Sequence, residues 1–148
     1  MNYCSEIWGN TYKSSIHSIV IQQKKILRNI CSVSRNYHTN PLFSKYQLLK
    51  FEDIIELKTA CIMFKAKQLS LPVNIQSLFN SQNEFHYVTR QHGLFRQKFT
   101  SSNLKSMCLS VKGVKLWNVL PRELTNCKNI VSFKKMYKAL IFNKYTSM

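Results

Sequence analysis

Residues 51–69, with the sequence FEDIIELKTACIMFKAKQL, decide the fold that this chain is expected to adopt. Their apolar side chains stand at positions 51, 54, 55, 60–62, 64 and 69, a spacing wide enough to predict a helix buried on more than one face. Glu52, Asp53 and Glu56 fall in its first turns, where negative charge complements the helix dipole. We therefore expect a mainly α-helical, bundle-like fold.

Two further helices are predicted upstream of this segment. Apolar residues recur with helical spacing over 14–31, with one polar lapse at Gln23, and they are Ile16, Ile19, Val20, Leu27 and Ile30. A short helix is expected over 42–48, with Asn40 as its cap and Pro41 in its first turn.

Pro72 should end the helix that begins at Phe51, and residues 73–79 are expected to add one or two turns.

In residues 80–148, the spacing of apolar residues predicts little regular structure at first and a clear helix near the end. Residues 80–102 are rich in Ser, Asn and Gln and lack periodicity, which predicts a loop with short extended pieces. Residues 104–111 weakly suggest a strand, and Ser110 is expected to cap a short helix that Pro121 closes. A final helix is predicted over 132–144, with one apolar face made of Phe133, Met136, Tyr137, Leu140 and Ile141. The expected segments are 1–79, 80–110 and 111–148, within one domain.

The charge of the chain restricts its possible partners. Lys and Arg number 22 against six Asp and Glu, and the formal net charge is +16 over 148 residues. A compact fold with this charge repels itself unless a polyanion relieves the repulsion, so nucleic acid is the expected partner. Solvated basic helix faces are the simpler alternative.

Candidate phosphate contacts follow from where the cations gather. They lie opposite an apolar helix face near residues 24–35, opposite another near 134–138, and among the aromatics of 85–99, and they are Lys24, Lys25, Arg28, Arg35, Arg90, Arg96, Lys98, Lys134, Lys135 and Lys138. The aromatics Phe95 and Phe99 either stack on bases or belong to the core, and the sequence alone does not decide between these roles.

Patterns typical of catalysis are scarce. Two-metal phosphoryl transfer requires two or three convergent carboxylates, whereas only Glu52 and Glu56 can share a helix face here. Phosphate loops, nucleophile elbows and zinc-site spacings do not occur, so we expect neither a cofactor nor a catalytic residue. The five cysteines are odd in number and widely spaced, which favours free thiols, with Cys61 and Cys108 as small core residues.

The sequence also bears on location. The first ten residues lack a basic stretch and an apolar stretch, so they do not resemble a secretory signal. The apolar runs are too short to cross a bilayer. We expect an intracellular protein of a reducing compartment, nucleus or cytoplasm, without a membrane partner.

The order of several short motifs resembles a known protein family. The matching motifs are YCSEIWG at 3–9, QQKK at 22–25, LRNI at 27–30, HTNPLF at 38–43, LKFEDI at 49–54, GVKLWNVLP at 113–121 and FKK at 133–135. Together they look like the carboxy-terminal part of reverse transcriptases of LINE-type, non-LTR retrotransposons of the jockey-like group. Each motif is weak alone, but their order and spacing make the likeness fairly specific over residues 3–145.

This resemblance implies a parent enzyme that copies RNA into DNA at a nicked chromosomal target. The present residues would correspond to the end of the thumb and the segment after it, which support the primer-template duplex. The family's Mg²⁺-binding aspartates lie in a Tyr-x-Asp-Asp motif of the palm, and nothing here matches that motif. The resemblance thus implies a non-catalytic region that binds an RNA–DNA hybrid or a DNA duplex without sequence preference.

Two alternatives remain at this stage. The chain is either an interaction piece that docks on a palm-containing polypeptide through Tyr3, Ile7, Trp8 and Trp117, or a decayed element copy without independent function. In the second case it would be unable to fold alone, because Met1 would begin within a helix that the parent enters from upstream. Cooperative unfolding would count against decay.

Overall fold

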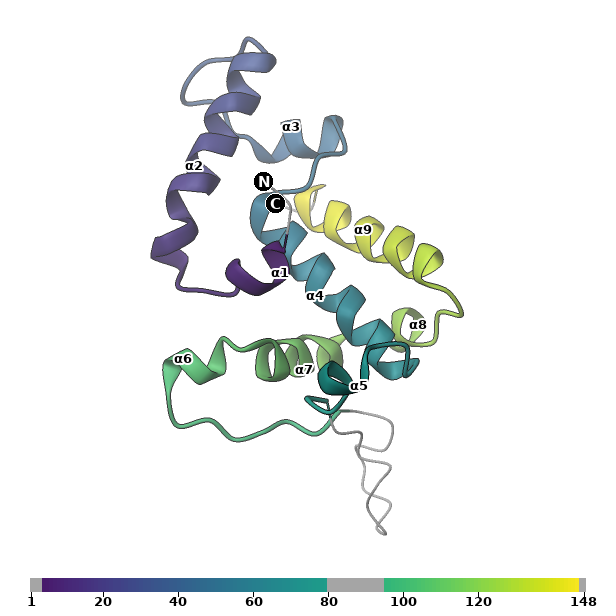
Figure 1. The fold of residues 1–148 in the computed structure, drawn as a ribbon. Coiled ribbons are helices and arrows are strands. Elements are labelled where there is room, and N and C mark those ends of the chain that lie inside the picture. The colour runs from purple at the N-terminus through teal and green to yellow at the C-terminus, as the bar shows by residue number, and fades with distance from the viewer. Residues whose placement is uncertain (1–3, 80–94, 147–148) are drawn as a thin grey trace.

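The computed structural model describes residues 4–79 and 95–146, and the mainly α-helical prediction is confirmed (Figure 1). Nine helices form within these ranges: α1 (Ser5–Trp8), α2 (Lys13–Ile30), α3 (Asn40–Lys45), α4 (Phe51–Lys67), α5 (Val73–Gln76), α6 (Asn103–Ser106), α7 (Leu109–Val119), α8 (Arg122–Thr125) and α9 (Ile130–Thr146). The predicted helices over 14–31, 51–69, 73–79 and 132–144 correspond to α2, α4, α5 and α9.

Helix α4 is the centre of the fold, as its apolar pattern predicted. It contacts α1, α2, α7 and α9, and Figure 1 shows it crossing the middle of the molecule between them. Its buried side chains are Phe51, Ile55, Leu57, Thr59, Ala60, Met63, Phe64 and Ala66. Burial on several faces explains why its apolar positions are not confined to one narrow stripe.

Aromatic side chains join the helices around α4. The ring of Trp117 in α7 lies 6.4 Å from that of Phe64 in α4 and 5.9 Å from that of Phe133 in α9, measured between centroids. Phe64 and Phe133 stack directly at 4.8 Å. One hydrophobic cluster thus runs from Leu27 to Tyr145 and holds α2, α3, α4, α7, α8 and α9 together.

Gly113 allows α7 to approach α4 closely. A Cβ atom at this position would lie 2.9 Å from Sδ of Met63, closer than ordinary van der Waals contact. Because Gly has no side chain, the two helices can pack with Met63 and Thr59 against the α7 backbone.

Several boundary predictions were wrong. Residues 103–106 and 109–119 are helical, so the weak strand prediction for 104–111 fails. Ser102 caps α6 through its hydroxyl, which accepts a hydrogen bond from the Lys105 backbone at 3.3 Å. The residue before α7 is Cys108 rather than Ser110, and Cys108 is exposed instead of buried. Local capping by Ser102 therefore outweighs the apolar pattern of this short stretch.

Two upstream details also differ from the prediction. Thr39 precedes α3 as its cap residue, and Asn40 already lies inside the helix, which ends at Lys45. Ile30, expected on the buried face of α2, is 74% exposed. The end of α2 packs against the core through Leu27 and, just after the helix, Cys31 and Val33, whereas Ile26 and Ile30 lie on its exposed side.

Helix α2 ends in a tight reversal at Ser32. The Val33 amide donates to the Arg28 carbonyl and the Ser32 amide to the Asn29 carbonyl, each at 3.1 Å. This pairing is the Schellman motif, and Ser32 adopts the required left-handed conformation with φ 49°. A residue with a Cβ atom is strained there, whereas Gly is not.

Replacing Ser32 with Gly should therefore raise the free energy of unfolding by about 0.5–1 kcal/mol. The same substitution at Ser18, an exposed position inside α2, should lower it by roughly 0.5 kcal/mol, because Gly is a poorer helix former than Ser. Urea unfolding followed by circular dichroism measures both changes. A loss of stability in both variants would contradict the assignment of strain to Ser32.

Candidate nucleic-acid interface

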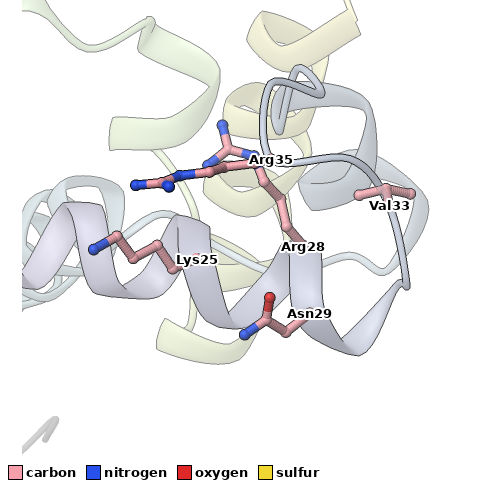
Figure 2. A pocket seen from close by; sticks show the side chains of 5 residues that line it. All are labelled: Lys25, Arg28, Asn29, Val33 and Arg35. Atoms are coloured by element: carbon pink, nitrogen blue, oxygen red, sulfur yellow. The ribbon is translucent and has the colours of Figure 1, made fainter.

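The cations predicted near residues 24–35 gather at the exposed end of α2. A hollow of about 330 Å³ is lined there by Lys25, Arg28, Asn29, Val33 and Arg35. Lys25 and Arg28 are three residues apart and so lie on one face of the helix. Figure 2 shows the side chains of Arg28 and Arg35 running alongside each other, with Lys25 one turn earlier on α2.

A second hollow of about 370 Å³ adjoins the first, and Arg28 lines both. Its other lining residues come from α2, from the connection to α3 and from the start of α3, and they are Lys24, Asn36, Tyr37, His38, Thr39 and Asn40. Among the described residues, no Asp or Glu lines either hollow. We call Lys24, Lys25, Arg28 and Arg35 the α2 cluster. The structure thus brings these four predicted cations together.

The turn after α2 determines where the cluster lies. The reversal at Ser32 sends the chain back along α2, which places Arg35 beside Arg28 although seven positions separate them. Nε of Arg28 donates to the Tyr37 carbonyl at 3.0 Å. This hydrogen bond positions the guanidinium of Arg28 through its Nε atom. The two terminal nitrogens of a guanidinium commonly make the bidentate pair of hydrogen bonds to a phosphate.

The remaining predicted cations do not join the α2 cluster. Lys134, Lys135 and Lys138 are exposed on α9, but the charges of Lys134 and Lys138 act on Cys61 of α4, so these two lie beside the packed helix and not on the opposite face that was predicted. Arg96 and Lys98 are exposed in the loop before α6. Arg90 lies outside the described residues.

Lys65 belongs near the α9 cations, which the sequence pattern did not indicate. Burial raises the pKa of the Cys61 thiol, and the charges of Lys134, Lys65 and Lys138 oppose that rise. These three lysines on α4 and α9 therefore surround one partly buried thiol. All five cysteines are free, as predicted.

The aromatic predictions divide between core and surface. Phe95 is buried against Phe79 and Trp117, with centroids 6.2 and 6.3 Å away, so it is a core residue. Phe99 is 91% exposed and is not part of the core. The helical spacing that joins them in the sequence has no structural meaning, because residues 96–102 form no helix.

The surface proposed for docking on a palm is only partly present. Trp117 is 1% exposed, so its assignment to a docking surface was wrong: it fills the core between α4, α7 and α9. Ile7 is largely exposed, and Trp8 is partly exposed and stacks on Phe51. Tyr3 lies outside the described residues.

The carboxylates of α4 have a structural role beyond the helix dipole. Glu52 and Asp53 stand in the first turn, as predicted. In addition, the Tyr145 hydroxyl donates to Asp53, and the Tyr137 hydroxyl donates to Oε1 of Glu56 at 2.9 Å. Two of the six acids therefore attach α9 to α4.

Both tyrosines should make stability fall at high pH. Burial raises the pKa of Tyr137 above its ordinary value of 10.0, with Glu56 adding to the rise, and burial also raises the pKa of Tyr145, assisted by its hydrogen bond to Asp53. Above pH 10 the unfolded chain therefore loses protons that the folded chain retains, so the folded state loses stability as pH increases.

Replacing both tyrosines with Phe should reduce this decline above pH 10, whereas Tyr12→Phe at an exposed position should leave it unchanged. Unfolding in urea at a series of pH values gives the slopes for each variant. Lysines lose their charge in the same range, but they are common to all variants and cancel in the comparison. An identical slope for the double variant would show that the two phenols do not contribute.

A third and larger hollow carries both signs of charge. It measures about 600 Å³ and lies between α1, α2, α4 and α7, with the charged lining residues Lys13, Glu52, Asp53, Glu56, Lys112 and Lys115.

Over residues 4–79 and 95–146, His, Cys, Asp and Glu form no group of three or more able to hold a metal ion. No described helix is both long and apolar enough to cross a membrane.

Sequence reasoning missed the part of the interface that follows α2. Asn36, Tyr37 and His38 line the second hollow, and Asn29 and Val33 line the first. A signal existed only for Asn29 and His38, which fall within the motifs LRNI and HTNPLF of the family resemblance.

Comparisons with protein-family models, with curated proteins and with solved structures found no match to this chain.

Proposed function

We propose that this chain is a nucleic-acid-binding region that grips the phosphate backbone of a duplex through the α2 cluster. In this proposal it is the thumb-side region of a LINE-type reverse transcriptase and carries out no catalysis itself. The parent's Mg²⁺ would be held by the palm, and the region would act inside the cell, in the nucleus or cytoplasm.

One observation carries the proposal. Four cations from α2 and the turn after it line two adjoining hollows, Arg28 lines both, and no described acid lines either one. Solvated basic faces alone do not require such a gathering, because like charges close together repel one another. A polyanion relieves this repulsion, and phosphate groups also suit the donors that Arg presents.

The chemistry of the cluster predicts which features of a ligand are recognised. Lys and Arg side chains that contact phosphates position a protein on nucleic acid but carry no direct information about base sequence. Asn29 and Asn36, which line the hollows, can donate to phosphate or sugar oxygens in the same manner. We therefore expect binding without sequence preference, and the family resemblance implies that the partner is a duplex of either RNA–DNA or DNA type.

Fluorescence anisotropy with short labelled duplexes tests this function. We expect two unrelated DNA sequences and one RNA–DNA hybrid to bind with affinities within about tenfold of one another, since specific readout typically separates sequences by 10³ or more. Discrimination of that larger size, or no binding at low salt, would contradict the proposal.

The exposure of Ile7 and Trp8 favours one alternative, docking on a palm-containing polypeptide. An apolar protein interface and a phosphate interface respond differently to salt, because counterion release dominates only the second. Capture of a palm-containing partner that persists unchanged at high salt would support the docking role.

A further inference from the structure

The loop between Phe95 and α6 presents an aromatic ring to solvent. Phe99 is 91% exposed, the highest value among the exposed large hydrophobic residues of the described chain. Isolated exposed apolar side chains are common on proteins, so exposure alone has little meaning. The way the loop is anchored and charged distinguishes this residue from the others.

Both ends of the loop are fixed. At its start, Asn118 of α7 binds both backbone groups of Phe95: the Phe95 amide donates to Oδ1 at 3.2 Å, and Nδ2 donates to the Phe95 carbonyl at 2.9 Å. At its end, the loop leads into α6, which is capped by Ser102 and contacts α7. The ring of Phe99 therefore projects from a short segment held at two points.

Cations lie on both sides of Phe99 in the sequence. Arg96 and Lys98 are exposed in the loop, where Nζ of Lys98 donates to the Leu78 carbonyl at 3.4 Å, and Lys105 is exposed on α6 just beyond it. Between positions 85 and 122 the sequence contains no Asp or Glu. A nucleobase can stack on an exposed aromatic ring while nearby cations contact the phosphates of the same strand. The lack of acids along this stretch of sequence favours such binding.

We infer that Phe99, with Arg96 and Lys98, forms a second site that binds an unpaired strand by stacking a nucleobase on the Phe99 ring. A duplex conceals the faces of its bases, so this site takes single-stranded DNA or RNA. Figure 1 shows the loop at the opposite end of the molecule from the end of α2. This inference rests on the proposed function and extends it from duplex to single strand.

Two probes separate stacking from charge. One is an oligothymidine strand of about twelve nucleotides, within the usual span of a single-strand site, and the other is an abasic strand of the same length and charge. Phe99→Ala should weaken oligothymidine binding by about fivefold or more, because base–aromatic stacking is typically worth that much. Binding of the abasic strand and of a duplex should remain unchanged.

Two further variants serve as controls. Phe99→Tyr keeps an aromatic face and should bind oligothymidine as the unmodified chain does. Leu104→Ala removes another exposed apolar side chain nearby and should also have no effect.

Each contrary result has a distinct meaning. Unchanged oligothymidine binding in Phe99→Ala would overturn this inference, as would an equal loss with the abasic strand. If the duplex still depends on the α2 cluster in the same preparation, the proposed function stands while this inference fails. If neither duplex nor single strand binds, both fail.

Discussion

Reversing three charges of the α2 cluster should abolish most duplex binding. The variant Lys25→Glu, Arg28→Glu, Arg35→Glu replaces the three cations that line the first hollow. At about 50 mM salt, release of counterions by one phosphate contact is worth roughly tenfold in affinity, so losing three contacts should cost about 100- to 1,000-fold. Anisotropy titration with one labelled duplex measures the loss.

A charge-matched control excludes a general effect of net charge. Reversal of Lys134, Lys135 and Lys138 on α9 lowers the net charge from +16 to +10, as the α2 variant also does. These lysines are exposed on α9, and the hollows of the α2 cluster do not include them. We expect this control to lose much less affinity. Equal losses in the two variants would mean that overall charge, and not the α2 cluster, holds the duplex.

The largest effect on stability is expected at Trp117. Its side chain is 1% exposed and packs against Phe64, Phe95 and Phe133, which come from three separate parts of the chain. Trp117→Ala would leave a cavity among these rings and should lower the free energy of unfolding by about 3–5 kcal/mol. Because whole domains are stabilised by only about 5–15 kcal/mol, this variant should be close to unfolding.

Two companion variants make the Trp117 result interpretable. Trp117→Phe retains an aromatic ring and should cost less, which keeps the test informative if Trp117→Ala does not fold. Val119→Ala removes an exposed side chain in the same helix and should change stability by less than about 0.5 kcal/mol. Urea unfolding gives all three values. A loss below about 1 kcal/mol in Trp117→Ala would contradict the central position of this residue.

The fold was largely predictable because helical periodicity is local. The apolar spacing in 14–31, 51–69 and 132–144 identifies α2, α4 and α9 from residues within a few turns of one another. The ends were less predictable, since they depend on single contacts. The capping of α6 by Ser102 and the start of α3 at Asn40, after Thr39, are examples.

Contacts distant in sequence could not be read from the pattern. The Tyr137–Glu56 hydrogen bond joins residues 81 positions apart, and the hydrogen bonds of Asn118 to Phe95 join residues 23 positions apart. A helix-end charge explained Glu56 adequately, so nothing in the sequence indicated a tyrosine partner. Such pairs depend on how α4, α7 and α9 pack together.

The cations of the α2 cluster were predicted as phosphate contacts, but the arrangement that brings all four together was not. Helical spacing places Lys24, Lys25 and Arg28 near one another, whereas the position of Arg35 depends on the left-handed turn at Ser32. A non-Gly residue in that conformation leaves no clear sequence signal. The same turn brings in Asn36 and Tyr37, which were therefore missed.

The salt dependence of duplex binding tests the central claim most directly. If the four cations of the α2 cluster each contact a phosphate, the logarithm of affinity should fall against the logarithm of salt concentration with a slope of roughly −3.6. The α2 triple variant should reduce that slope by about 2.7, the contribution of three phosphate contacts. The same slope in the triple variant and the unmodified chain would contradict the account.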